Sequence, residues 1–143
     1  MSRQMNILLV EDNTLDVMMI QRALSRIAPD AVVTRAEDGI EALEIINSGR
    51  TTNPFFILLD INMPRMNGHE FLKELRKTAI ASDSVVFMFT TSDSVQDIAR
   101  AYRESVNGYI VKPHNREDMN KKISTLQEFW TICEPPVRPV GPV

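Results

Sequence analysis

Strand-like and helix-like segments alternate five times along the chain, and this alternation limits the fold more than any other feature. The apolar runs at 6–10, 55–59 and 85–89 are continuous, which predicts strands that are buried on both faces of a sheet. Strands that alternate with helical segments predict parallel strands joined by crossover helices. We therefore expect an α/β fold with a doubly wound, five-stranded parallel sheet of order 2-1-3-4-5, flanked by five helices.

Local signals set the expected bounds of these elements. Strands are expected at 6–10, 31–35, 55–59, 85–89 and 108–111. The first helix is expected over 14–28, with Asn13 or Thr14 as its cap. Later helices are expected from about residues 40, 68, 95 and 116, the fourth capped by Ser94 and the last by Asn115. The apolar side of the last helix carries Met119, Ile123, Leu126 and Trp130.

Composition places the chain among ordinary globular proteins. At 143 residues, with 43% hydrophobic and 24% charged residues, it has room for one core and not for a second domain. The formal net charge of −3, with no block of Lys or Arg, argues against direct binding of nucleic acid or of an anionic membrane. No run has the length of a membrane span or the form of a signal peptide, so a cytoplasmic protein is expected. Cys133 is the single cysteine, so no internal disulfide can form.

The last ten residues differ from the rest of the chain. Residues 134–143 hold four of the eight prolines, so they cannot continue a helix. We expect a domain over 1–133 and a Pro-rich, extended tail over 134–143. Both a docking segment and an unstructured end stay open for this tail.

Polar side chains follow four of the expected strands. Glu11 and Asp12 come directly after the first strand, and Asp60 follows the third. Thr90 ends the fourth strand, and Lys112 follows the fifth. In an open parallel sheet, ligands bind beyond the carboxyl ends of the strands, where the strand order reverses. With right-handed crossovers these five side chains should lie at one edge of the sheet.

This set of side chains predicts phosphoryl chemistry. Carboxylates with no cation repel one another, and Mg²⁺ accepts one or two of them beside water and phosphate oxygens. Asp60 has the position of a nucleophile that attacks phosphorus in line, and Lys112 supplies a cation for the phosphoryl oxygens. The hydroxyl of Thr90 can bond a phosphoryl oxygen and draw its loop inward, which would make the site a switch.

Taken singly, each feature has a plainer interpretation. Glu11 and Asp12 suit a helix N-terminus, Lys112 suits a surface, and Thr90 suits a strand end. Their coincidence at matching strand ends favours one site. His69 and His114 are isolated, and we expect them to face solvent or cap a helix rather than bind metal.

These residues make the chain resemble the receiver domain of bacterial two-component response regulators, a flavodoxin-like fold, over about residues 5–130. The resemblance implies that Glu11 and Asp12 hold Mg²⁺ and that Asp60 is both a metal ligand and the phosphoacceptor. It implies that the backbone carbonyl of Asn62 is a further metal ligand. Such proteins are phosphoproteins of phosphorelay signal transduction and are not counted as enzymes.

The same resemblance assigns the residues that respond to phosphorylation. It implies that Thr90 is the switch hydroxyl, Tyr109 the aromatic rotamer switch and Lys112 the lysine on the phosphoryl group, and that Lys112–Pro113 is a cis peptide. Within the family, Thr90-Thr91-Ser92 and Phe129-Trp130-Thr131-Ile132 resemble single-domain regulators that are paired with phytochrome-type histidine kinases.

Two departures from the family pattern stand out. Ser105-Val106 replaces the usual Gly-Ala before the fifth strand, at a position that often needs a positive φ, at a cost of about 1 kcal/mol. Thr91 replaces a smaller alanine, and we hypothesise slow dephosphorylation as a result. Equal phosphoryl half-lives in the native protein and Thr91→Ala would remove that hypothesis.

The expected function is a stand-alone response regulator. It accepts a phosphoryl group on Asp60 from a histidine kinase and relays the signal through the face of the fourth helix, fifth strand and fifth helix. A homodimer through this face is a further expectation. A haloacid-dehalogenase-type phosphatase needs a second acid at position 62, where this chain has Asn62. A receiver fold that signals without phosphorylation stays open as the alternative.

Overall fold

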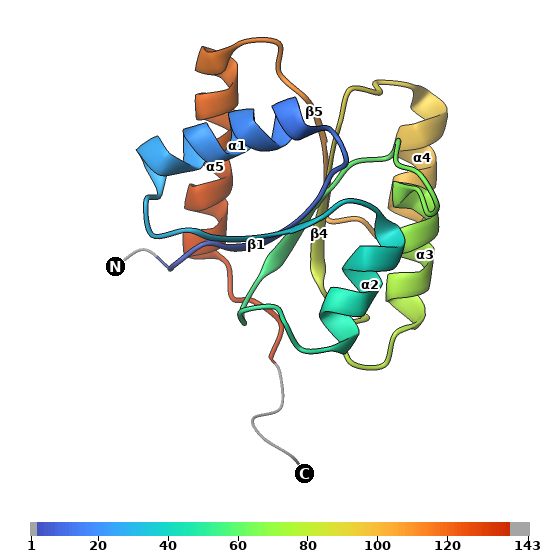
Figure 1. The fold of residues 1–143 in the computed structure, drawn as a ribbon. Coiled ribbons are helices and arrows are strands. Elements are labelled where there is room, and N and C mark those ends of the chain that lie inside the picture. The colour runs from blue at the N-terminus through green and yellow to red at the C-terminus, as the bar shows by residue number, and fades with distance from the viewer. Residues whose placement is uncertain (1–2, 138–143) are drawn as a thin grey trace.

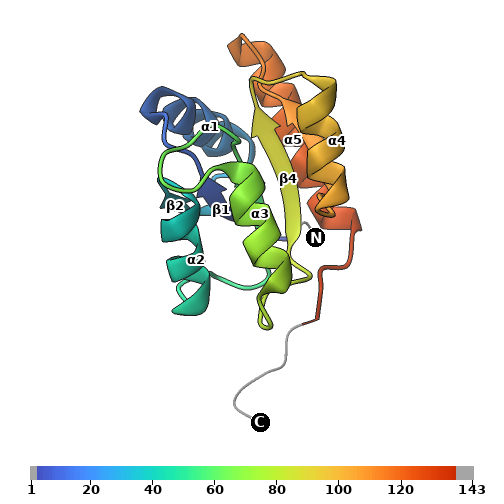
Figure 2. The same ribbon diagram turned by 90° about the vertical axis from the view of Figure 1, so that its right-hand side faces the viewer.

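The computed structural model describes residues 3–137, which form a three-layer α/β sandwich (Figures 1 and 2). Five strands and five helices alternate from end to end of this region. The strands are β1 (Asn6–Val10), β2 (Val32–Ala36), β3 (Phe56–Leu59), β4 (Val85–Thr90) and β5 (Gly108–Val111). The helices are α1 (Thr14–Ile27), α2 (Gly39–Asn47), α3 (Gly68–Lys77), α4 (Val95–Arg103) and α5 (Arg116–Ile132).

The strands pair in the order β2-β1-β3-β4-β5, and every pair is parallel. The predicted fold class and strand order are therefore confirmed, and the predicted element bounds differ from the observed ones by about a residue. The strand order reverses between β1 and β3, which are neighbours in the sheet. In this pair Ile7 lies opposite Phe56 and Val10 lies opposite Leu59. The carboxyl ends of these two central strands thus meet at the same edge of the sheet.

The sheet divides the hydrophobic interior into two cores. Helices α1 and α5 cover one face, and α2, α3 and α4 cover the other (Figure 1). Alternate residues of β1 enter opposite cores: Ile7 and Leu9 pack under α1 and α5, while Leu8 and Val10 pack under the other three helices. This explains why the central strands have continuous apolar sequences, since both of their faces are buried.

Each helix begins at a polar cap. The side chain of the cap accepts a hydrogen bond from the backbone N–H three residues on, which satisfies a donor that the helix leaves free. The caps are Asn13, Asp38, Asn67, Ser94 and Asn115. The caps expected for the first, fourth and last helices are confirmed.

The fourth helix, α4, lies near the surface of the molecule. Its one buried residue is Ala101, whereas Val95 and Tyr102 are 77% and 51% exposed. The small Ala101 therefore makes the buried contact of this helix with the core, and Val95 and Tyr102 point away from it.

The start of the described chain lies against the end of α5, at the amino-terminal edge of the sheet. The guanidinium of Arg3 donates to the carbonyl oxygens of Trp130 and Cys133 and lies 5.7 Å from the centre of the Trp130 ring. Residues 134–137 form neither helix nor strand, and the rest of the predicted tail, 138–143, lies outside the described residues. No helix within residues 3–137 is long and apolar enough to cross a membrane.

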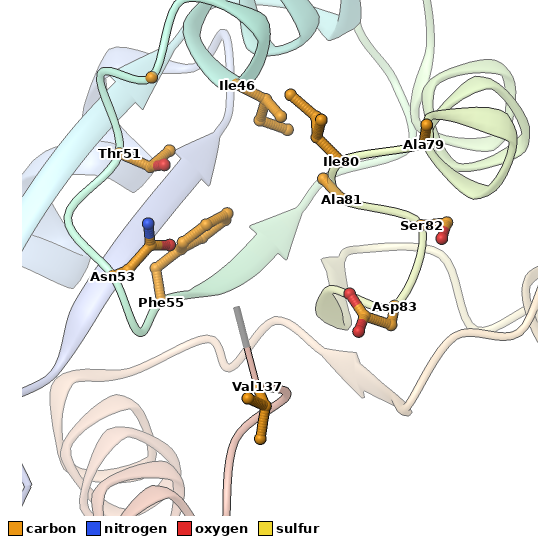
Figure 3. Close-up of a pocket in the computed structure, with 11 residues that line it drawn as sticks. Ile46, Thr51, Asn53, Phe55, Ala79, Ile80, Ala81, Ser82, Asp83 and Val137 are labelled. Carbon is orange, nitrogen blue, oxygen red and sulfur yellow. The ribbon is translucent and has the colours of Figure 1, made fainter. Parts of the chain in front are cut away.

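A pocket of about 490 Å³ lies at this edge as well, remote from the carboxyl ends of the strands. Its walls are the loop before β3, including Thr51 and Phe55, and the loop before β4, including Ile80. Val137 faces it from the other side (Figure 3). The start of the Pro-rich tail therefore passes beside this pocket.

Candidate functional site

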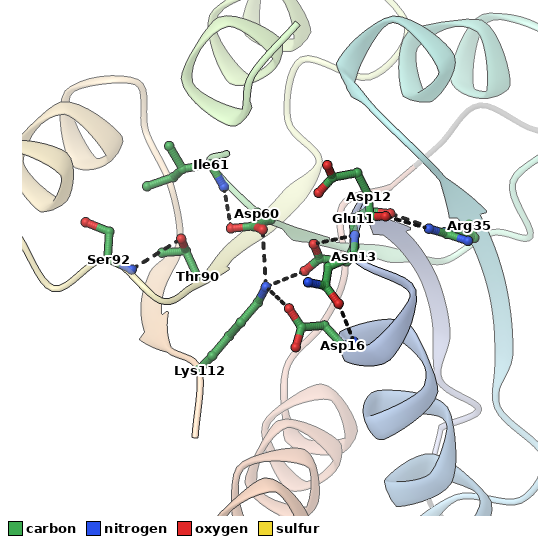
Figure 4. A network of polar contacts seen from close by, with 10 residues as sticks. All are labelled: Glu11, Asp12, Asn13, Asp16, Arg35, Asp60, Ile61, Thr90, Ser92 and Lys112. Carbon is green, nitrogen blue, oxygen red and sulfur yellow. Dashed lines mark hydrogen bonds and ion pairs between the residues drawn. The ribbon is translucent and has the colours of Figure 1, made fainter. Parts of the chain in front are cut away.

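The carboxyl edge of the sheet gathers the predicted polar residues (Figure 4). Glu11 and Asp12 follow β1, Asp60 follows β3 and Lys112 follows β5. The residues Glu11, Asp60 and Lys112 are all buried, at 1%, 7% and 7% exposed, whereas Asp12 is exposed. The topology thus brings together residues that are about 100 positions apart in the sequence.

Lys112 is the centre of the charge network. Its Nζ lies 2.6 Å from Glu11 Oε1, 2.6 Å from Asp16 Oδ2 and 3.2 Å from Asp60 Oδ2. Asp16 was not among the predicted site residues. Asp16 lies in the first turn of α1, so its side chain stays near the carboxyl edge of the sheet, close to Glu11 and Asp12. Its helical spacing from this acidic pair was the signal that could have identified it.

The pKa shifts follow from this crowding. Burial raises the pKa of Glu11 from 4.5 to about 7, although the Lys112 ammonium group acts in the opposite direction. Burial alone would lower the pKa of Lys112, but its contacts with Asp16 and Glu11 outweigh burial and raise it above its ordinary value. The lysine therefore stays charged, and the carboxylates around it are only partly neutralised.

The donor set fits a hard divalent cation. Glu11, Asp12 and Asp60 each offer one carboxylate oxygen, and these three oxygens lie within 4.8 Å of one another. Mg²⁺ prefers carboxylate oxygens and keeps several waters, and the exposure of Asp12 leaves one side of the cluster open to solvent. Asn62 is exposed and lies just beyond Asp60 in the same loop.

Backbone contacts fix the position of Asp60. Its Oδ1 accepts from the N–H of Ile61 at 2.8 Å, and its own N–H donates to Val10 O at 3.0 Å. Gly68 returns the loop against this segment by donating to Ile61 O at 2.9 Å. A Cβ at position 68 would lie 2.3 Å from Asp60 O, so only glycine allows this close approach.

Thr90 ends β4, and Tyr109 lies within the neighbouring β5, where it pairs with Met88. Thr90 is fully buried, and its Oγ1 accepts from the N–H of Ser92 at 3.4 Å. The Tyr109 hydroxyl donates to Ser92 O at 2.9 Å. Both predicted switch residues therefore contact the same residue of the β4–α4 loop.

A second network in this region was missed. His69 is 3% exposed, so the expectation that it faces solvent or caps a helix is wrong. Its Nε2 lies 3.0 Å from Asp97 Oδ1, and the Ser92 hydroxyl donates to Asp97 Oδ2 at 2.6 Å. These two contacts lower the pKa of Asp97 and tie α3 to the start of α4. The packing of α3 against α4, which the sequence does not reveal, buries the histidine.

A further expectation is not met at the end of β5. Among the described residues, the cis peptide bond is Asn53–Pro54, and Lys112–Pro113 is not cis. The expected positive φ before β5 is confirmed, because Ser105 has φ of 63°.

The fold and the edge together define a class, that of flavodoxin-like α/β proteins with an acidic cation-binding site at the strand-order reversal. Residues 7–124 match the family model described as response regulator receiver domain. The chain belongs to this family.

Named relatives support the same assignment. The chain is 35% identical to the probable methanogenesis regulatory protein FilR2 of Methanothrix harundinacea, over 87% of this chain and 82% of that one. It is 32% identical to response regulator Rcp1 of Synechocystis, over 87% of each chain. The solved structure of the phosphorylated cyanobacterial phytochrome response regulator RcpA matches with a TM-score of 0.85 and 31% identity, over 94% of this chain and all of that one.

Membership has general consequences. Receiver domains are signalling modules of two-component systems, partner with histidine kinases and bind Mg²⁺ at an acidic cluster. The cluster formed by Glu11, Asp12 and Asp60 occupies the corresponding place in this chain.

Proposed function

We propose that this receiver takes a phosphoryl group onto Asp60 from a phosphohistidine of a sensor histidine kinase. The observation that supports this most directly is the position of the Asp60 carboxylate. It is fixed at the end of a buried strand, 3.2 Å from the Lys112 ammonium group and beside Glu11 and Asp12. One oxygen of this carboxylate accepts from a backbone N–H, and the other is directed toward the Lys112 ammonium group.

The proposed reaction is a single displacement at phosphorus. A carboxylate oxygen of Asp60 attacks in line, the P–N bond to the kinase imidazole breaks, and the imidazole leaves with the bonding electron pair. Lys112 turns from Asp60 to a phosphoryl oxygen, which keeps its ammonium group paired.

Glu11, Asp12, Asp60 and the carbonyl of Asn62 are the proposed ligands of Mg²⁺. When bound, this ion neutralises charge on the phosphoryl oxygens. The residues themselves orient the site: Glu11 lies against Lys112, and Asp12 faces the solvent from which the donor approaches.

The proposed output begins at Ser92. When the Thr90 hydroxyl turns to the new phosphoryl group, it gives up the hydrogen bond that it accepts from the Ser92 N–H. The β4–α4 loop then moves. Tyr109 follows because its hydroxyl donates to Ser92 O. The signal then leaves through α4, β5 and α5.

Two finer proposals concern partners. Similarity to RcpA, which is described as a phytochrome response regulator, favours a phytochrome-type kinase in the cytoplasm. Exposed apolar groups on α4 and α5 favour a homodimer through this face.

We also divide the chain into the receiver, 1–133, and the tail, 134–143. The charge of the chain supports a function without direct nucleic-acid binding.

Intact mass after incubation with acetyl phosphate and Mg²⁺ tests the central proposal. One phosphoryl adduct is expected in the native protein and none in Asp60→Asn or in a metal-free sample. Asp118→Asn, which changes an exposed carboxylate on α5, is the matched control and should form the adduct. If neither acetyl phosphate nor a phosphohistidine donor gave an adduct, the phosphorylation-independent interaction module would replace this proposal.

A further inference from the structure

A groove of about 470 Å³ lies between α1 and α5, outside the carboxylate cluster. The two helices cross on the same face of the sheet, with the start of α5 beyond the crossing (Figure 1). Each helix contributes methionine and arginine side chains, and α5 also contributes an asparagine. The lining residues are Met19, Arg22 and Arg26 from α1, and Arg116, Met119 and Asn120 from α5. A recess of this size falls within the range of small-molecule sites.

The groove concentrates positive charge. None of its three guanidinium groups forms an ion pair with a carboxylate of residues 3–137; Arg26 donates instead to the backbone oxygen of Arg22 at 3.0 Å. Arg116 is the first residue of α5, where the helix dipole disfavours a cation. All three arginines are exposed, and in a chain with a net charge of −3 their grouping around one recess gives a positive site that suits an anionic ligand.

The base of the groove has a different character. Met119 is buried, and Met19 packs partly buried against the same core. Thioethers adapt to irregular shapes and contact aromatic rings favourably, and arginine guanidinium groups stack on planar rings. The side-chain oxygen of Asn120 is buried, and it has no hydrogen-bond partner among the described residues. Such an oxygen accepts from an N–H or O–H group that a ligand brings.

We propose that this groove binds a nucleotide. The phosphate lies between Arg22, Arg26 and Arg116, the base lies on the two methionines, and an N–H of the base donates to Asn120 Oδ1. An anion alone would satisfy the arginines but not the amide oxygen, and an apolar ring alone would leave the arginines unpaired. A nucleotide carries the anionic, planar and N–H-donating parts in one small molecule.

Isothermal titration of the full chain with AMP, GMP, adenosine, guanosine and inorganic phosphate tests this proposal. At least one nucleotide should bind with a Kd below about 1 mM, at least about tenfold tighter than its own nucleoside or phosphate alone. Arg22→Gln with Arg116→Gln should weaken binding about tenfold or more. Arg103→Gln, which neutralises an exposed arginine at the end of α4, is the matched control and should leave binding unchanged.

Two more variants separate the parts of the site. Asn120→Leu should reduce the preference for nucleotide over phosphate, and Asp60→Asn should leave nucleotide binding intact because Asp60 is not part of the groove. Circular dichroism and the Tm of each variant show whether the fold is retained.

Three results would overturn the proposal. Phosphate that binds as tightly as any nucleotide would reduce the groove to a simple anion site. Unchanged nucleotide binding in the double arginine variant would place the ligand elsewhere. Slower phosphotransfer from a kinase in that variant, with no nucleotide binding in the native protein, would make the groove a protein-docking surface.

Discussion

Glu11 is a buried carboxyl group whose pKa depends on the other charged groups of the site. It is 1% exposed, contacts Lys112 at 2.6 Å and shares a small volume with the carboxylates of Asp12 and Asp60. Burial raises its pKa to about 7, so the folded protein holds a proton at pH values where the unfolded chain has lost it. The site without metal is thus a source of instability at neutral pH.

The sign of the resulting pH dependence is set by proton uptake. Between pH 4.5 and about 7 the folded state binds the extra proton, so the free energy of unfolding should fall by about 2–3 kcal/mol as pH rises through this range. Urea unfolding in the presence of EDTA measures this free energy at each pH, and the fall should be largely absent in Glu11→Gln. Mg²⁺ should stabilise the native protein more than the variant. Parallel pH profiles for the two proteins would contradict this account.

Ser105 is a second residue whose backbone matters more than its side chain. It adopts φ of 63°, while its carbonyl oxygen accepts from Arg76 at 2.6 Å, so the turn before β5 is held in a conformation that suits glycine.

Ser105→Gly should therefore raise the free energy of unfolding by about 0.5–1 kcal/mol in chemical denaturation, because the strain at positive φ is relieved. Ser82→Gly, in an exposed turn without positive φ, should be neutral or destabilising and serves as the control. A loss of stability in both variants would mean that the Ser105 side chain outweighs the strain.

At the scale of elements, the start of α3 controls the position of the reactive aspartate. Asn67 and Glu70 form a capping box, and Gly68 packs directly on the backbone of Asp60. The helix start is thus both a cap and a support for the site.

Gly68→Ala should disturb the site more than it disturbs the helix. The added Cβ would lie 2.3 Å from Asp60 O and 2.9 Å from the Cα of Ile61, so stability should fall by about 2–4 kcal/mol and phosphorylation by acetyl phosphate should slow. Asn67→Ala should cost about 1 kcal/mol through the lost cap and leave the rate nearly unchanged. Equal rate losses in the two variants would argue against a direct effect on Asp60.

At the scale of the molecule, exposed apolar groups occur on both α4 and α5. Val95 and Tyr102 project from α4, and Phe129 and Ile132 from α5, at exposures between 40% and 79%. Phe129 also packs edge-on against Phe87, so part of it belongs to the core. This leaves Ile132 as the better probe of association.

Sedimentation with a beryllofluoride mimic of the phosphoryl group tests the homodimer. We expect association that depends on concentration, and Ile132→Asp should weaken it at least about tenfold by placing a charge in the contact. Ile80→Asp, an equivalent change at an exposed residue outside α4 and α5, should have no effect. A protein that stays monomeric both with and without the mimic would remove the dimer proposal.

The sequence predicted the sheet well because each central strand is a continuous apolar run that ends in a polar residue. Asp60 and Lys112 could be placed at one edge from topology alone. Asp16 needed the further step of helical spacing in the first turn of α1. His69 could not be placed, because its burial depends on the packing of α3 against α4.

The contact of Arg3 with the end of α5 has a consequence for engineering. The side chain of residue 3 reaches the carbonyl of Cys133, so both ends of the folded region emerge together on the side opposite the carboxylate cluster. A short linker should be able to join them, with new termini opened in an exposed loop, because close termini favour circular permutation. A fluorescent or effector domain fused at either end would likewise stand clear of the surface that an incoming phosphoryl donor must reach.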